Sequence, residues 1–172
     1  MREEIMSITE ENTKLTALEE ILDNNGEHKP VRVCFVCTGN TCRSPMAAAV
    51  LNLLGKGAYV AESAGIAARE GDRIAENAIL ALNDAGIKST EDNNYEAHRA
   101  KNIDTATVEA CDRLVAISAS HRMALICAFP EAVDKISVMP NDIFDPFMYG
   151  FDVYRECLEQ ITDGIKQMFL LD

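Results

Sequence analysis

The sequence predicts an α/β fold, a three-layer sandwich in which a four-stranded parallel sheet carries helices on both faces. Two observations predict it. From residue 31 onward, short apolar segments alternate with longer segments of helical periodicity, which is typical of βαβ units. A polar, glycine-containing loop also follows the first predicted strand and opens the next helix. Open α/β sheets bind their ligands at this position.

The predicted strands are short and apolar. They are expected at residues 31–36, 58–61, 112–117 and 135–138. The first is rich in Val, Cys and Phe, as expected for a strand buried on both faces of a parallel sheet. The predicted helices span residues 42–54, residues 73–85, a segment capped by Ser118 or Ser120 that ends before Pro130, and residues 152–169.

Residues 1–30 differ from the remainder of the chain. They contain eight acidic and three basic residues and no aromatic residue. Ser7 and Glu10 fit a capping box, and apolar residues at positions 8, 15, 18 and 22 suit one helix face. We therefore expect an acidic helical extension over 1–30 and a separate domain over 31–172. The extension is either a helix that docks on the domain, a poorly ordered tail, or a helix for partner binding or self-association.

The composition excludes several classes of protein. A net charge of −12 argues against broad binding to nucleic acid or to anionic membranes, because such surfaces need clustered Lys and Arg. No apolar run reaches the length of a transmembrane helix, and the acidic first residues do not resemble a signal peptide. Six cysteines without an export signal favour reduced thiols in a cytoplasmic protein. Three unpaired histidines argue against a histidine metal site.

The loop after the first strand has the residues of an anion-binding site. It reads Cys37-Thr38-Gly39-Asn40-Thr41-Cys42-Arg43-Ser44-Pro45. A loop there directs backbone N–H groups and a helix N-terminus to one point, and Gly39 allows a positive φ or a close backbone approach. Arg43 can donate two parallel hydrogen bonds to phosphate oxygens. The same positive field favours a reactive Cys37 thiolate, which suits attack on phosphorus and a phosphocysteine intermediate.

A second motif, Asp145-Pro146-Phe147, follows the fourth predicted strand. Protonation of a leaving group needs a carboxylic acid on a separate loop. Pro146 restricts Asp145 to extended conformations and stiffens this loop. Phe147 is then a candidate wall of the pocket.

Together these motifs resemble the low-molecular-weight phosphotyrosine phosphatase family. The resemblance extends from about residue 31 to the C-terminus, and includes residues 62–65 and 98–100 as further landmarks. It implies a four-stranded parallel sheet, no metal or other cofactor, and a phosphorylated protein as substrate. Cys37 would be the nucleophile, Arg43 the phosphate clamp, and Asp145 the general acid and then the base for water. The loop residues Thr38, Gly39, Asn40, Thr41, Cys42 and Ser44 would hold the phosphate or the shape of the loop, and Ser44 would also hydrogen-bond the thiolate.

The resemblance also implies supporting and regulatory residues. Asn40 would keep the loop in shape, with Ser63 and His98 as its supports. Cys42 would form a reversible disulfide with the nucleophile, because a reactive thiolate oxidises to a sulfenic acid that a neighbouring thiol traps. Ala48 departs from the family pattern, which usually has Glu at this position of the supporting network.

Thr41 bears on the substrate. Phosphotyrosine-directed members usually carry an apolar residue there, whereas members that resemble bacterial protein-arginine phosphatases carry Thr. A hydroxyl on the pocket wall offers a polar contact to a guanidinium, and the Asp145 carboxylate can pair with that cation. We therefore expect a phosphoarginine phosphatase, with phosphotyrosine as the alternative substrate.

Other classes remain as alternatives. An arsenate reductase would need further redox thiols, but Cys111, Cys127 and Cys157 include no closely spaced pair. A sugar-phosphotransferase component or a non-catalytic phosphate-binding module would not need Arg43 and Asp145 together with Cys37.

Overall fold

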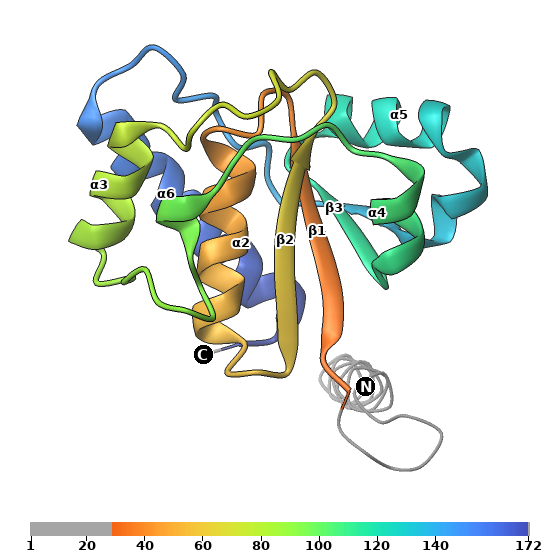
Figure 1. Cartoon of the computed structure of the whole chain (residues 1–172), viewed down its shortest axis with the longest axis horizontal. Helices are drawn as coiled ribbons and strands as arrows, with labels where there is room; N and C mark the ends of the chain where they lie inside the picture. The colour runs from red at the N-terminus through yellow and green to blue at the C-terminus, as the bar shows by residue number, and fades with distance from the viewer. Residues whose placement is uncertain (1–28, 172) are drawn as a thin grey trace, which may run out of the picture.

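The computed structural model describes residues 29–171, and these form an α/β sandwich around one sheet (Figure 1). The strands are β1 (Val31–Cys37), β2 (Tyr59–Gly65), β3 (Arg113–Ala116) and β4 (Ile136–Val138). The helices are α2 (Arg43–Leu54), α3 (Glu76–Asp84), α4 (Thr105–Ala110), α5 (Ala119–Ala128) and α6 (Phe151–Phe169), with the 3-10 turns η1 (Tyr95–Ala97) and η2 (Pro130–Lys135). The predicted extension over residues 1–30 lies almost entirely outside the described residues.

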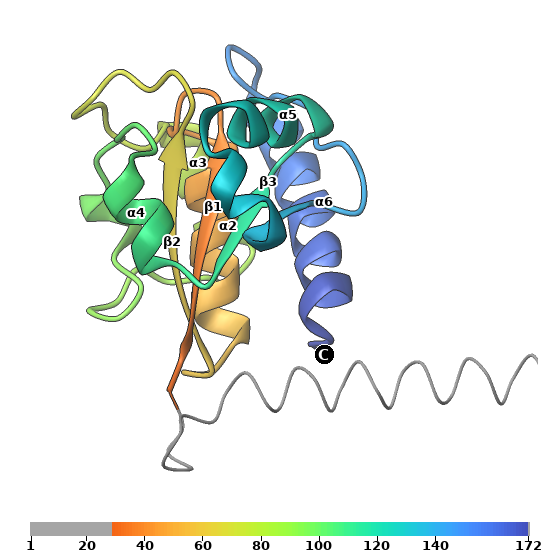
Figure 2. The same ribbon diagram turned by 90° about the vertical axis from the view of Figure 1, so that its right-hand side faces the viewer.

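The sheet has the order β2-β1-β3-β4, and every pairing is parallel. Figure 1 shows α2, α3 and α6 on one side of the strands and α4 and α5 on the other. The quarter turn of Figure 2 brings α4 and α5 in front of the sheet, with α2 behind it. The predicted fold class is therefore confirmed.

Alternation along β1 explains why both faces must be covered. Val33 and Phe35 are buried against the larger helical layer, whereas Cys34 and Val36 are buried in the core on the other face. Successive side chains of a strand point to opposite faces, so a continuous apolar segment requires helices on both. Phe35 is fully buried, and a side chain of this size contributes about 1.5–3 kcal/mol when it leaves water.

Two predicted boundaries differ from the structure by more than two residues. The strand expected at 58–61 continues to Gly65, because its polar half pairs with the second half of β1. The helix expected from residue 73 begins at Glu76, because Arg73 forms an antiparallel bridge with Arg99 instead. Sequence reasoning also missed α4, which has only six residues and is capped by the Asp104 side chain accepting from the Thr107 amide at 2.8 Å.

The parallel strands bring the ends of three segments to one edge. Cys37 at the end of β1 pairs with Gly65 at the end of β2. The Ile117 amide, just after β3, donates to the Val36 carbonyl of β1, and Ser118 then caps α5 by accepting from the His121 amide. The loops after β1 and β3 therefore meet at the carboxyl edge of the sheet. No helix within residues 29–171 combines the length and apolar character that a membrane crossing requires.

Candidate functional site

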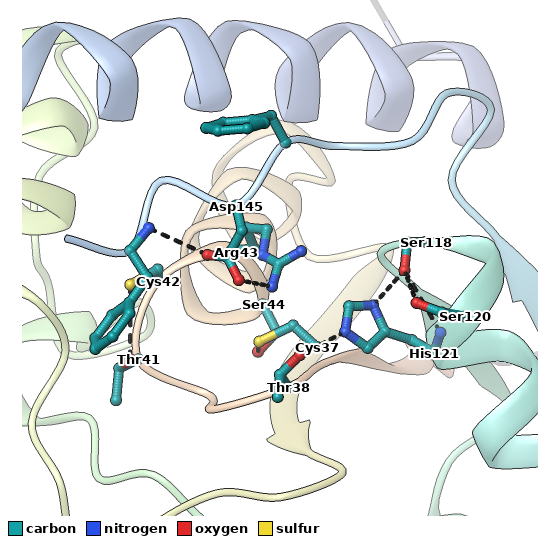
Figure 3. A network of polar contacts seen from close by, with 12 residues as sticks. Cys37, Thr38, Thr41, Cys42, Arg43, Ser44, Ser118, Ser120, His121 and Asp145 are labelled. Atoms are coloured by element: carbon teal, nitrogen blue, oxygen red, sulfur yellow. Dashed lines mark hydrogen bonds and ion pairs between the residues drawn. The ribbon is translucent and has the colours of Figure 1, made fainter. Parts of the chain in front are cut away.

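The loop between β1 and α2 surrounds a pocket of about 180 Å³. Its walls are Cys37, Thr38, Gly39, Asn40, Thr41, Cys42, Arg43, Asp145 and Phe147. Asp145 and Phe147 come from the loop between β4 and α6, about a hundred residues further along the chain. The structure thus brings together the two motifs that the sequence suggested, as Figure 3 shows from close by.

Cys37 lies buried at the start of the loop, with two polar groups close to its sulfur. The Ser44 hydroxyl is 3.0 Å from Cys37 Sγ, and the Asn40 backbone N–H donates to the same atom at 3.3 Å. The Asn40 N–H is a donor, and the Ser44 hydroxyl can turn its hydrogen to the sulfur or to the Ala64 carbonyl, so both groups can stabilise a thiolate. Their presence at one sulfur fits a group that carries negative charge during a reaction.

Asn40 holds the loop through its side chain. Its Nδ2 donates to Ser44 Oγ at 3.0 Å and to Ser63 Oγ at 2.9 Å, and its Oδ1 accepts from the Lys101 amide at 3.0 Å. His98 Nε2 lies 2.8 Å from the Asn40 carbonyl. The side-chain amide of the fully buried Asn40 therefore joins the loop to β2 and to the segment after η1. Both predicted supports contact Asn40, Ser63 at its side chain and His98 at its carbonyl.

The position of positive φ corrects one expectation. Gly39 was expected to supply either a left-handed conformation or a close approach, but the left-handed residue is Asn40, with φ of 55°. A Cβ at Gly39 would meet only Thr41 Oγ1, at 3.8 Å. Asn adopts this conformation more readily than most residues because its short polar side chain bonds locally.

Arg43 and Asp145 meet across the pocket. Arg43 Nη2 donates to Asp145 Oδ2 in an ion pair, and Asp145 Oδ1 accepts from the Phe147 amide at 3.1 Å. The Arg43 side chain is only 8% exposed, and among the described residues its Nε has no hydrogen-bond partner. A buried donor without a partner is costly, and a phosphate oxygen in the pocket would supply one.

The N-terminus of α2 adds to this anion-binding character. Cys42 is its N-cap residue and forms no side-chain cap hydrogen bond. The first amides of a helix have no partners within the helix, and they carry the positive end of its dipole. The site therefore combines loop amides, a helix N-terminus and a guanidinium around one thiol.

Cys42 lines the pocket and also contacts α6. Its Sγ is 3.2 Å from the Tyr154 hydroxyl and 3.6 Å from Thr41 Oγ1. Burial raises the pKa of the Cys42 thiol, whereas the contacts with Tyr154 and Thr41 lower it. Burial also raises the pKa of Tyr154 far above its ordinary value.

Sequence reasoning missed two residues of this site, Tyr154 and His121. His121 lies buried near the start of α5, with Nε2 2.9 Å from Thr38 Oγ1 and Nδ1 2.7 Å from Ser118 Oγ (Figure 3). A spacing of three residues between a capping Ser and His was the available signal. It gives no indication that the ring faces a loop eighty residues earlier.

A second hollow lies behind the loop. It measures about 250 Å³ and includes Ala48, Ser63 and His98 in its lining. Ala48, at the position where the family pattern has Glu, lines this hollow with an apolar side chain. Burial lowers the pKa of His98, as do Arg99 and Lys101, while the Asn40 carbonyl opposes the shift.

Comparison with known proteins identifies the family. The family model described as "Low molecular weight phosphotyrosine protein phosphatase" matches residues 32–170. The protein-arginine-phosphatase of Geobacillus stearothermophilus is 34% identical over 146 residues, covering 81% of this chain and 94% of that protein. A low molecular weight protein-tyrosine-phosphatase of Streptomyces coelicolor is also 34% identical, over 150 residues, covering 76% and 86%.

A solved structure agrees with these relatives. The YwlE arginine phosphatase from Geobacillus stearothermophilus matches with a TM-score of 0.74 and 32% identity, over 82% of this chain and 92% of that one. The chain therefore belongs to the low molecular weight phosphotyrosine protein phosphatase family and is a cysteine-dependent phosphatase.

Proposed function

We propose that this phosphatase hydrolyses phosphoarginine in proteins through a phosphocysteine intermediate. The observation that supports it best is the meeting of Cys37, Arg43 and Asp145 at one pocket. Cys37 Sγ attacks phosphorus while Arg43 and the loop amides bind the phosphoryl oxygens. The P–N bond breaks as Asp145 gives its proton to the leaving nitrogen. Asp145 then accepts a proton from water, whose oxygen displaces the Cys37 sulfur and releases inorganic phosphate.

The other loop residues support these two steps. Ser44, 3.0 Å from Cys37 Sγ, stabilises the thiolate before attack and as it leaves in the second step. Asn40, held by Ser63 and His98, keeps the amides directed at the phosphoryl group. Preorganised donors of this kind stabilise charge in the transition state without further rearrangement.

The choice of phosphoarginine rests on the pocket wall and on the relatives. Thr41 lines the pocket with a β-branched hydroxyl, which can accept a hydrogen bond from a guanidinium N–H. Two of the similar proteins bear the name protein-arginine-phosphatase. Phosphotyrosine is the second candidate, because Phe147 lines the pocket with an aromatic ring that is 60% exposed and the relative from Streptomyces coelicolor is named for tyrosine.

A comparison of peptide substrates tests the proposal. Phosphoarginine and phosphotyrosine peptides of the same sequence are assayed with the wild type, Thr41→Ile and Cys37→Ser. We expect a higher kcat/KM on phosphoarginine, a fall in that preference in Thr41→Ile, and no turnover by Cys37→Ser. Cys127→Ser is the matched control, since this thiol is exposed on α5. Preference for phosphotyrosine in the wild type, unaltered by Thr41→Ile, contradicts the arginine assignment, and normal turnover by Cys37→Ser contradicts the intermediate.

Cys42 is proposed as the redox partner of the nucleophile. A peroxide oxidises the Cys37 thiolate to a sulfenic acid and is itself reduced to water. The Cys42 thiolate then attacks the Cys37 sulfur, forming the S–S bond and releasing hydroxide. All six cysteines of the chain are free in the structure. A reducing cytoplasm as the compartment stays a prediction.

A further inference from the structure

His121 is a buried titratable group that contacts the pocket wall and that the proposed reaction does not use. It is only 4% exposed, and both ring nitrogens are engaged, one by Thr38 at 2.9 Å and one by Ser118 at 2.7 Å. Ser118 in turn lies 2.9 Å from Ser120 Oγ and caps α5. The ring is therefore fixed at both ends, from the helix cap to the loop (Figure 3).

The surroundings of His121 favour a neutral imidazole ring. Burial and Arg43 lower the pKa of His121, while Asp145 and Asp142 oppose the shift. A neutral imidazole has one donor and one acceptor nitrogen. In either tautomer, the contact with Thr38 uses one of the three hydrogen-bonding positions of that hydroxyl and leaves the other two available.

Thr38 is the residue through which His121 can reach the substrate. It is exposed at the start of the loop and lines the pocket. An exposed Thr with no fixed partner would sample several rotamers about χ1, and its hydroxyl would hydrogen-bond to water. A bond to a fixed, buried ring selects one rotamer and gives the hydroxyl a constant direction at the pocket.

We propose that His121 is a positioning residue for substrate selection, which holds the Thr38 hydroxyl so that it contacts a polar, N–H-bearing leaving group rather than an aromatic ring. The inference rests on the proposed phosphoarginine activity. The Thr38 hydroxyl is then a second polar group on the pocket wall, in addition to the Thr41 hydroxyl. A guanidinium has several N–H donors in fixed directions, so two oriented oxygens bind it better than one.

A double-mutant cycle tests this role. Thr38→Val, His121→Leu and the double variant are assayed for kcat/KM on matched phosphoarginine and phosphotyrosine peptides. Each single change is expected to lower the ratio of the two values about fivefold, which corresponds to the loss of one hydrogen bond of about 1 kcal/mol. The double variant is expected to show no larger fall than Thr38→Val, because the two residues act through one contact.

Controls separate positioning from a purely structural role. Thr38→Ser keeps the hydroxyl and is expected to retain most of the preference. Ser120→Ala removes a hydroxyl that contacts Ser118 but not the His121 ring, so the ratio of the two kcat/KM values is expected to stay unchanged. The Thr38 variants keep the test valid if His121→Leu folds poorly, as measured by its thermal unfolding midpoint. Equal losses on both peptides, or an unchanged ratio in Thr38→Val, overturn the inference. Absence of phosphoarginine turnover by the wild type overturns the proposed function itself.

Discussion

Replacement of Asn40 by Ala is the sharpest test of how the loop is held. The side chain makes three hydrogen bonds, to Ser44, Ser63 and the Lys101 amide, at 2.9–3.0 Å. At about 1 kcal/mol each, their loss costs about 3 kcal/mol. Ala also tolerates the φ of 55° less well than Asn, which adds about 1 kcal/mol. We expect Asn40→Ala to lower the free energy of unfolding by about 4 kcal/mol.

Two further variants divide this total into its parts. Asn40→Gly loses the same bonds but accepts positive φ, so it is expected to be about 1 kcal/mol more stable than Asn40→Ala. Ser63→Ala removes one acceptor and is expected to cost about 1 kcal/mol. Because the amides of a misplaced loop no longer meet the phosphoryl group, kcat of Asn40→Ala is expected to fall about a hundredfold.

Urea unfolding followed by circular dichroism measures the stabilities, and steady-state kinetics on the preferred peptide measures kcat. A loss below about 1 kcal/mol in Asn40→Ala would refute the hydrogen-bond accounting. An Asn40→Gly variant no more stable than the Ala variant would refute the argument from φ. Full kcat in a destabilised Asn40→Ala would separate the loop's stability from its function.

Three further changes probe the surroundings of the loop. Gly65→Ala would place a Cβ 2.5 Å from the Thr38 carbonyl oxygen, so calorimetry should show a loss of about 1–3 kcal/mol together with a fall in kcat. Tyr154→Phe removes a contact that lowers the pKa of Cys42, so mass spectrometry should show slower disulfide formation after peroxide. Asp145→Asn should lower kcat about 10²–10⁴-fold and reduce the inhibition constant for inorganic phosphate, because it removes the anionic partner of the guanidinium.

For each of these three variants, a different outcome would contradict the expectation. Gly150→Ala is the control for Gly65, since a Cβ there meets nothing within 4 Å, and equal losses in both would dismiss the steric argument. Unaltered disulfide kinetics in Tyr154→Phe would show that the hydroxyl does not act on the Cys42 thiol. Undiminished kcat in Asp145→Asn would transfer the acid role to another group.

The sequence predicted the parts of the molecule that depend on local pattern. A buried strand, a loop with Cys37 and Arg43, and a helix follow one another without a gap, so periodicity and motif agree on where each begins. Asp145 could be joined to them only through the resemblance to a family, because a hundred residues separate the two motifs. Parallel topology is what brings their loops to one edge of the sheet.

Other contacts had no local signal. His121 meets Thr38 because β3 pairs with β1 and ends at the same edge. Tyr154 meets Cys42 because α6 returns across α2 late in the chain. Residue type alone makes Gly39 a candidate for positive φ or for a close backbone approach, whereas the folded loop has its positive φ at Asn40. Tertiary contacts of this kind decide which of two permissive residues adopts positive φ.

The Arg43–Asp145 ion pair gives a physical reason for the proposed substrate. The Arg43 guanidinium and the Asp145 carboxylate form an ion pair across the pocket, so a phosphoryl group that accepts from Nη2 of Arg43 displaces the carboxylate from that nitrogen. A phosphotyrosine offers Asp145 no cation in exchange. A phosphoarginine brings its own guanidinium, so one ion pair is replaced by two, and the Asp145 side chain is drawn toward the leaving nitrogen. Both ion pairs form inside one pocket, between Arg43 and the phosphoryl group and between Asp145 and the substrate guanidinium. A chain of net charge −12 therefore needs no basic surface to bind this substrate.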